Sequence, residues 1–169
     1  MSESKNQTAI FAAGCFWGVQ FYFDEVPGVV ETEVGYIGGN TQNPSYETVC
    51  THTTGHAEAT KIIFDPEKIS YETLLRQFFR MHDPTQLNRQ GPDVGDSYRS
   101  AIFYVDEDQK AAAQKILNEL NKSQFSGKIV TTLEKAGEWW PAEDYHQKFT
   151  QKTGRGMCHI PYAPVEAGK

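Results

Sequence analysis

One cysteine between two glycines is the residue in this sequence best placed to do chemistry. Cys15 lies in the sequence Gly-Cys-Phe-Trp-Gly at positions 14–18, where the apolar stretch 9–13 gives way to an amphipathic stretch. This order is typical of a strand that turns into a helix, with the cysteine at the helix N-terminus. Unpaired N–H groups and the helix dipole lower the pKa of a thiol from about 8.5 to roughly 3.5–7.5 in such sites. The pattern favours a reactive thiolate, and a small core cysteine is the alternative. The aromatic residues Phe16 and Trp17 would form an apolar pocket wall beside the sulfur.

Glu58 is the most unusual carboxylate of the chain. It lies among small residues in the sequence Gly-His-Ala-Glu-Ala, positions 55–59, at the beginning of a stretch that soon becomes apolar. Burial there would raise the pKa of the carboxyl group and let it donate a proton to an oxygen that gains negative charge. A glutamate on the solvent side of a strand is the alternative.

Three further residues could assist such an acid. Tyr46 and Tyr98 lie in or beside loops that contain glycine or proline, where a phenol hydroxyl can point into a pocket. Either ring could equally belong to the core. Asp93 lies within the loop 91–95, where it either stabilises a turn through its own backbone or serves the site.

The histidines suggest two other kinds of site. Cys50, His52 and His56 offer three zinc ligands within seven residues, although structural zinc usually takes four ligands in two close pairs. This pattern would make the chain a zinc-binding interaction module. His146 or His56 could instead act as the base for Cys15 in a cysteine hydrolase or acyltransferase, which needs a ring nitrogen about 2.6–3.2 Å from the sulfur.

Composition narrows the class of protein. The chain has 169 residues, of which 38% are hydrophobic, and a net charge of −6. We expect a single domain, residues 1–169, that is monomeric. The charge argues against binding of nucleic acid or an anionic membrane, and no stretch approaches the roughly 18 apolar residues of a membrane span. Three cysteines are few for a chain of this length, and an odd number cannot all pair, which argues against a disulfide framework. We therefore expect a cytoplasmic protein with reduced thiols.

Hydrophobic periodicity predicts the order β-α-β-β-α-β-α-β. The expected strands lie near 8–13, 30–36, 57–64, 99–105 and 128–133, and the expected helices near 16–25, 71–79 and 106–120. From Trp139 onward the periodicity is lost, which predicts a tail that wraps the surface without regular structure. Residues 1–7 and 150–169 are expected to be irregular termini. The order predicts an α+β two-layer sandwich with a split βαβ (ferredoxin-like) core and an irregular C-terminal tail.

Six ordered motifs between about residues 9 and 149 closely resemble the peptide-methionine sulfoxide reductase A family. They are Gly-Cys-Phe-Trp-Gly at 14–18, Gly-Tyr-Ile-Gly-Gly at 35–39, Asn-Pro-Ser-Tyr at 43–46, Thr-Gly-His-Ala-Glu-Ala at 54–59, Arg-Gln-Gly-Pro-Asp at 89–93 with Ser-Tyr-Arg-Ser at 97–100, and Pro-Ala-Glu-Asp-Tyr-His-Gln at 141–147. This enzyme family reduces one epimer of methionine sulfoxide. The resemblance implies an enzyme that repairs oxidised proteins or reduces methionine sulfoxide itself, with no bound cofactor and no metal.

The resemblance also implies roles for single residues. Cys15 would attack the sulfoxide sulfur, Glu58 would protonate the oxygen, and Tyr46 and Tyr98 would hydrogen-bond that oxygen. Phe16 and Trp17 would bind the ε-methyl group of the S epimer, and Asp93 would order the oxygen-binding loop or the substrate backbone.

The end of the chain bears on how an enzyme of this family would be recycled. Cys158, in the sequence Gly-Arg-Gly-Met-Cys-His at 154–159, is similar to the recycling cysteine of family members that form a disulfide with the nucleophile and are reduced by thioredoxin. Dithiothreitol would replace thioredoxin in vitro. Only one tail cysteine is present, so thioredoxin would attack a Cys15–Cys158 disulfide directly. Cys50 occupies a position that the family does not require for catalysis.

Overall fold

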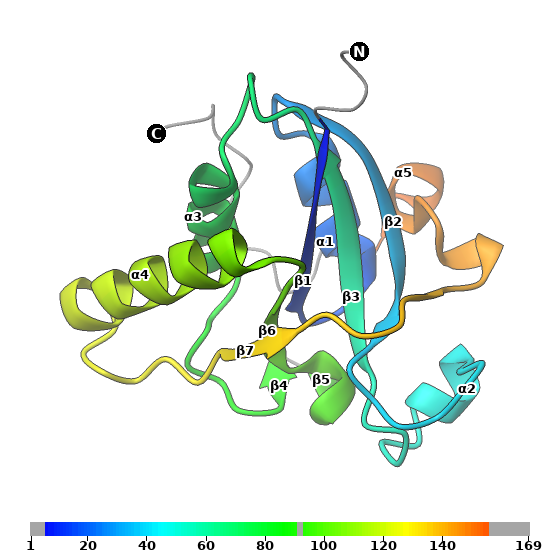
Figure 1. Cartoon of the computed structure of the whole chain (residues 1–169). Coiled ribbons are helices and arrows are strands. Elements are labelled where there is room, and N and C mark those ends of the chain that lie inside the picture. Colours follow the sequence, from blue (N-terminus) through cyan, green and yellow to red (C-terminus); the bar gives the residue numbers. More distant parts are fainter. Residues whose placement is uncertain (1–5, 91–92, 156–169) are drawn as a thin grey trace.

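A mixed β-sheet forms the centre of the molecule. The computed structural model describes residues 6–90 and 93–155. Within them the sheet has six strands in the order β7-β6-β1-β3-β2-β8 (Figure 1). The strands are β1 (Gln7–Ala13), β2 (Val29–Ile37), β3 (Ala57–Phe64), β6 (Ser100–Tyr104), β7 (Thr132–Lys135) and β8 (Trp140–Pro141). The helices are α1 (Phe16–Asp24), α2 (Tyr46–Val49), α3 (Tyr71–Met81), α4 (Glu107–Ser123) and α5 (Phe149–Thr153).

Strand β3 lies between β1 and β2 and pairs antiparallel with both. It is the strand that the sequence predicts with the correct bounds, and seven of its neighbours on β2, from Glu31 to Ile37, follow one register without a shift. On the other side of β1, β6 pairs antiparallel, and β7 then pairs parallel with β6. The sheet is therefore mixed, which confirms the predicted α+β class.

Helices α1, α3 and α4 cover one face of the sheet. Figure 1 shows α3 beside α4, and α1 behind β1 and β3. Ser70 begins α3 by accepting a hydrogen bond from the N–H of Thr73 at 3.0 Å, the N-cap that the sequence predicts. The apolar stripe of α3 is buried as expected, and its last residue, Met81, is 0% exposed. The core on this face contains Phe11, Ile62, Phe64 and Ile102 from the sheet and Phe23, Leu74, Phe78, Ile116 and Leu120 from the helices.

A loop instead of a helix covers the opposite face. The segment between β7 and β8 crosses the strands there (Figure 1), and its Trp139 packs against a small buried cluster that includes Phe103. Trp139 also donates a hydrogen bond from Nε1 to Glu33 at 2.6 Å. This contact brings the chain from β7 across to the β2 edge, where β8 begins.

The C-terminal third differs from the expectation in two ways. The last long strand is β7 (Thr132–Lys135), a few residues later than predicted, and the segment expected to be irregular contains β8, a 3₁₀ turn η3 (Asp144–His146) and α5. β8 pairs with β2 through Tyr36. These elements have two to five residues, too few to produce a hydrophobic period, so only tertiary contacts specify them.

Two shorter features flank the sheet. β4 (Arg89–Gln90) and β5 (Asp93–Val94) form a separate two-stranded ladder, followed by the 3₁₀ turn η2 (Asp96–Tyr98).

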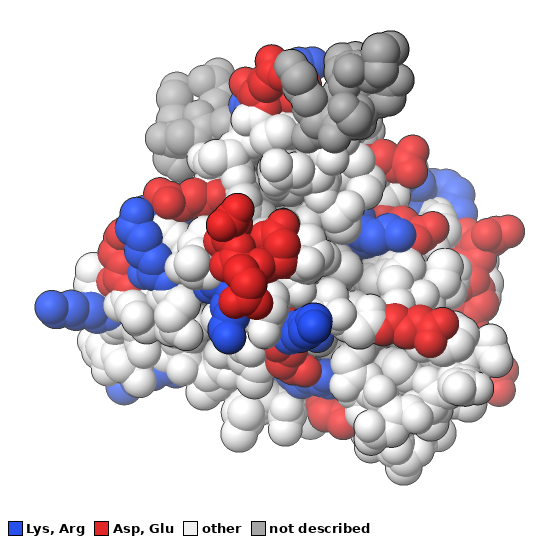
Figure 2. All heavy atoms as spheres, viewed as in Figure 1, with Lys and Arg blue, Asp and Glu red and all other residues white. Residues whose placement is uncertain are grey.

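On the face in Figure 2, acidic and basic side chains are interspersed and form no continuous basic area. In the described part of the chain no helix is long and apolar enough to cross a membrane.

Candidate active site

Cys15 is the N-cap residue of α1. Gly14, with φ of 93°, turns the chain out of β1 in a conformation that residues with a side chain rarely adopt. Cys15 is half-buried, and the first turn of α1 contains no acidic residue. The N–H groups of that turn have no partner within the helix and favour negative charge at this end. Cys15 therefore lies at a helix N-terminus, as the sequence pattern predicts, and its reactive thiolate stays a prediction.

The carboxyl group of Glu58 lies at the same helix end. Its Oε1 accepts a hydrogen bond from the N–H of Phe16 at 3.2 Å, although the two residues are 42 positions apart. Glu58 is 1% exposed, and its Oε2 has no hydrogen-bond partner among the described residues. The pKa of Glu58 is raised to about 8, mainly by burial and also by the charge of Asp93, while the N–H of Phe16 acts in the opposite direction. Glu58 is thus a neutral acid at pH 7, with one oxygen held and the other available.

Tyr46 and Tyr98 approach this carboxyl group from two different loops. Tyr46 begins α2 and Tyr98 ends η2, and both side chains are half-buried. Burial is the main cause that raises the pKa of each phenol, and the nearby charge of Glu58 is the next. Both phenols therefore keep their protons at neutral pH and can donate hydrogen bonds.

The thiol of Cys50 lies with these phenols, which sequence reasoning did not anticipate. Burial raises the pKa of Cys50, while hydrogen bonds from the hydroxyl groups of Tyr46 and Tyr98 act in the opposite direction. Tyr46 and Cys50 lie four residues apart, and the N–H of Cys50 donates to the carbonyl of Tyr46 at 3.0 Å. The spacing of four residues between Tyr46 and Cys50 places both side chains on one side of a helical turn, and this is the sequence signal that could have predicted their contact.

Phe16 and Trp17 form an aromatic wall next to the thiol. Phe16 is 1% exposed, and its ring lies 5.7 Å from that of Tyr36. The Trp17 ring stacks on Phe149 of α5, with the ring centroids 3.8 Å apart, and lies 6.4 Å from the ring of Tyr46. The wall combines residues from α1, α2 and α5, and only α1 could be assigned from the sequence.

His146 holds Trp17 in place and is not the base of a hydrolase. Its Nδ1 accepts a hydrogen bond from Nε1 of Trp17 at 2.8 Å, and the ring is 0% exposed. Burial lowers the pKa of His146, so the ring is neutral at pH 7. A neutral ring whose Nδ1 accepts carries its proton on Nε2, which leaves no lone pair for the proton of Cys15.

Glu143 supports the same wall from η3. Its two oxygens accept hydrogen bonds from the hydroxyl of Tyr36 at 2.8 Å and from the N–H of Tyr46 at 2.9 Å. Its Oε1 lies 3.9 Å from Nε2 of His146. Glu143 therefore joins β2, α2 and η3 around the aromatic residues.

The zinc hypothesis is wrong for the described residues. His56 accepts a hydrogen bond at Nδ1 from the N–H of Gly39, 3.1 Å away, and its Nε2 lies 2.8 Å from the carbonyl oxygen of Thr41. Both ring nitrogens are thus used to hold the loop after β2. Among residues 6–90 and 93–155 no group of three or more His, Cys, Asp or Glu side chains could hold a metal ion.

Asp93 and Cys158 complete the predicted set. Asp93 begins β5, and its charge raises the pKa values of Glu58 and Tyr98, which places its carboxylate near both. Cys158 lies outside the described residues.

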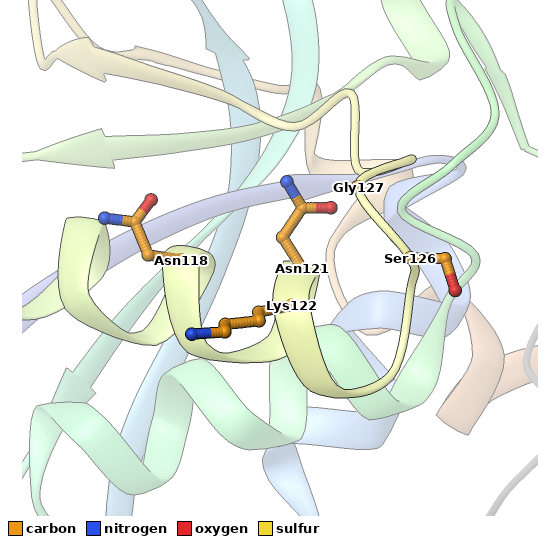
Figure 3. Close-up of a pocket in the computed structure, with 5 residues that line it drawn as sticks. All are labelled: Asn118, Asn121, Lys122, Ser126 and Gly127. Atoms are coloured by element: carbon orange, nitrogen blue, oxygen red, sulfur yellow. The ribbon is translucent and has the colours of Figure 1, made fainter.

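A shallow pocket on α4 has none of these groups. It has a volume of about 360 Å³ and is lined by Asn118, Asn121, Lys122, Ser126 and Gly127 (Figure 3). No thiol, carboxyl group or phenol lines it.

Comparison with known proteins agrees with this arrangement. The family model for peptide methionine sulfoxide reductase matches residues 7–168. The chain belongs to the peptide methionine sulfoxide reductase A family. The reductase MsrA of Methanothermobacter thermautotrophicus is 50% identical over 161 residues, 95% of each chain. The MsrA of Geobacter sulfurreducens is 50% identical over 153 residues, 90% of this chain and 94% of that one.

Solved structures of methionine sulfoxide reductases share the fold. The reduced form of Mxr1 from Saccharomyces cerevisiae has a TM-score of 0.87 at 32% identity, covering 96% of this chain and 94% of that one. Methionine sulfoxide reductase A of Corynebacterium diphtheriae has a TM-score of 0.84 at 35% identity, covering 94% and 84%. This chain is therefore a peptide methionine sulfoxide reductase by family and by fold.

Proposed function

We propose that this reductase acts on the S epimer of methionine sulfoxide, free or in proteins, through a sulfenic acid on Cys15. The observation that carries the proposal is the buried carboxyl group of Glu58, which is neutral at pH 7 and bonded to the N–H of the residue after Cys15. A thiolate and a protonated acid at one helix end are the two groups that sulfoxide reduction requires.

The reaction transfers the sulfoxide oxygen to the cysteine. The thiolate of Cys15 attacks the sulfoxide sulfur while Glu58 gives its proton to the oxygen, and the hydroxyls of Tyr46 and Tyr98 stabilise the charge that grows there. In the adduct the sulfur of Cys15 is bonded to the substrate sulfur, which still carries the protonated oxygen. Collapse breaks both of these bonds to the substrate sulfur as the hydroxyl oxygen bonds to the sulfur of Cys15. Methionine leaves, reduced by two electrons, and Cys15 becomes a sulfenic acid.

Selection of one epimer follows if the site holds both the methyl group and the oxygen of the chiral sulfoxide sulfur. Phe16 and Trp17 would hold the ε-methyl group, and Tyr46, Tyr98 and Glu58 would hold the oxygen. With both fixed, only one epimer directs its sulfur at Cys15. Asp93, near Glu58 and Tyr98, would order the oxygen-binding loop or the substrate backbone.

Recycling would use Cys158 and thioredoxin. The thiol of Cys158 attacks the sulfenic acid, water leaves, and a Cys15–Cys158 disulfide forms. A thioredoxin dithiol then reduces this disulfide and becomes oxidised itself. The structure of Mxr1 in complex with Trx2 supports a thioredoxin as reductant here by analogy.

We also infer that the four strands β6-β1-β3-β2 form a split βαβ core of the ferredoxin-like type. The antiparallel pairing of β3 with both β1 and β2 supports this reading, because β1, α1 and β2 then form the unit that β3 divides.

The experiment that tests the proposal replaces the nucleophile and separates the epimers. Cys15→Ser should abolish dithiothreitol-dependent reduction of a blocked methionine sulfoxide without changing the thermal unfolding temperature. The parent enzyme should reduce the S epimer and leave the R epimer intact. Activity of Cys15→Ser above a few per cent would sink the assignment of the nucleophile.

A further inference from the structure

His52 contacts the turn that carries Tyr98 although it lies on a different loop. Its ring lies against Gly95, where an added Cβ would be only 2.2 Å from Cε1 and 2.6 Å from Nδ1. Gly95 has φ of 135°, a conformation that glycine alone adopts readily, so the close approach and the backbone both require glycine.

The same ring reaches the next three residues of η2. Nδ1 of His52 lies 3.5 Å from Oδ1 of Asp96 and 3.5 Å from Oγ of Ser97. The ring meets that of Tyr98 edge-on, with the centroids 6.3 Å apart. His52 thus contacts four consecutive residues that end at the phenol.

The backbone of His52 is held in a conformation that costs energy. Its φ is 60°, in the left-handed region that residues with a side chain adopt uncommonly. The turn is fixed by the N–H of His52, which donates to the carbonyl of Val49 at 3.0 Å. The loop from α2 therefore directs this ring over η2.

The contact joins the two segments that carry the phenols. Tyr46 begins α2 and His52 follows its last turn. Cys50 between them lies close enough to the hydroxyls of Tyr46 and Tyr98 for both to act on the pKa of its thiol. Tyr98 itself is tied to Gly95 through its N–H, which donates to the Gly95 carbonyl at 3.0 Å. A shift of Gly95 relative to His52 would move the Tyr98 hydroxyl relative to that of Tyr46.

We propose that His52 is a positioning residue that fixes the hydroxyl of Tyr98 for the sulfoxide oxygen, an inference that rests on the function proposed above. It acts through Tyr98 and does not touch the substrate. The close contact of the His52 ring with Gly95 and η2 sets the distance between the hydroxyl groups of Tyr46 and Tyr98.

A double-mutant cycle on the single-turnover rate tests this proposal. Because a donor displaced by about 1 Å can lose up to roughly a hundredfold in rate, we expect His52→Gly to slow methionine formation roughly tenfold at saturating substrate, with little change in KM. Tyr98→Phe should slow it as well. The double variant should be no slower than Tyr98→Phe, within about twofold, because His52 has nothing left to position.

Ser126→Gly is the matched control. Ser126 also has a left-handed backbone, with φ of 54°, but it lies at the pocket on α4 (Figure 3). Its replacement removes a comparable backbone strain and should leave the rate unchanged. If His52→Gly does not fold, His52→Asn takes its place in the cycle, because asparagine tolerates the left-handed region and lacks the ring.

The outcomes separate this proposal from the proposed function. Rate losses that multiply in the double variant, or a parental rate in His52→Gly, would overturn the positioning role. A parental rate in Tyr98→Phe would overturn it too, since His52 could not then act through that hydroxyl. Turnover by Cys15→Ser, measured in parallel, would instead refute the proposed function.

Discussion

The chemistry proposed for single residues depends on a carboxyl group that stays protonated at neutral pH. Glu58 has one oxygen bonded to the N–H of Phe16 and the other without a partner among the described residues. Its burial, and the nearby negative charge of Asp93, both oppose ionisation. The unbonded oxygen is therefore the one that can carry the acidic proton towards a substrate.

The raised pKa of Glu58 predicts an alkaline limit to the rate. Below about pH 8 the group is protonated and can act, and above its pKa of about 8 it has lost its proton, so the single-turnover rate should fall as the pH rises through this value. Glu58→Gln should slow the reaction by about 10²–10⁴ at pH 7 and should remove this alkaline fall. Rapid-quench measurement of methionine formed per enzyme, across pH values on both sides of 8, checks both effects. A variant rate within threefold of the parent would mean that the proton comes from another group.

At the scale of elements, short segments late in the chain complete a pocket that begins near its start. Helix α5 reaches α1 through Lys148, whose Nζ donates to Asp24 at 2.6 Å, and through Gln151, which donates to the same carboxylate. This anchoring brings Phe149 onto Trp17. Five residues of helix thus support one side of the proposed methyl pocket.

Removal of this support should weaken substrate binding more than chemistry. In Phe149→Ala, Trp17 loses its stacked neighbour, so we expect KM for a methionine sulfoxide peptide to rise roughly tenfold, equal to about 1.4 kcal/mol of binding free energy. The single-turnover rate at saturation should fall much less, because Cys15 and Glu58 keep their positions. Phe149→Tyr retains the ring and is the control. An unchanged KM in Phe149→Ala would show that Trp17 is held by His146 alone.

At the scale of the whole molecule, the proposed functional residues are divided between the central strands of the sheet and the elements around it. Strand β1 leads into Cys15, and β3, between β1 and β2, carries Glu58. The phenols, Phe149 behind Trp17, Glu143 and the Asp93 loop come from α2, η2, α5, η3 and β5 around the sheet. The proposed recycling thiol, Cys158, lies still farther along the chain and outside the described residues.

This division predicts that repair and turnover can be separated. In Cys158→Ser, one equivalent of methionine per enzyme should form in a rapid burst, because nucleophile and acid are intact. Cys15 should then remain as a sulfenic acid that dimedone traps, and thioredoxin-supported turnover should collapse. Dithiothreitol should restore part of the turnover by reducing the sulfenic acid directly. Full thioredoxin-supported turnover in the variant would make Cys158 a bystander.

Local sequence patterns were sufficient to predict an element where its apolar residues recur regularly over many positions. The alternation over 57–64 predicts β3 with its observed bounds, and the stripe of α3 predicts its buried face. The Gly-Cys-Phe sequence predicts the helix start at Phe16, because the cue is confined to neighbouring residues. The short elements β8, η3 and α5 have no such cue and depend on contacts with β2 and α1.

The arrangement of the site could be predicted only in part. The residue types of Cys15 and Glu58 indicate their chemistry, but their juxtaposition depends on the pairing of β1 with β3. His146 has the side chain of a general base, and only the direction of its hydrogen bond with Trp17 shows otherwise. The place of Cys50 between two phenols depends on η2 folding against α2, which no local pattern encodes.

The burial of Met81 protects the enzyme from the damage that its family reverses. Met81 is the one methionine among the described residues, and it ends α3 with no exposed surface. Oxidation would add a polar oxygen to a side chain packed in the main core. The sulfur has no contact with solvent in the folded chain, so an oxidant in solution does not meet it there. During oxidative stress, when substrates are most abundant, the folded body of the catalyst therefore does not become a substrate for its own copies.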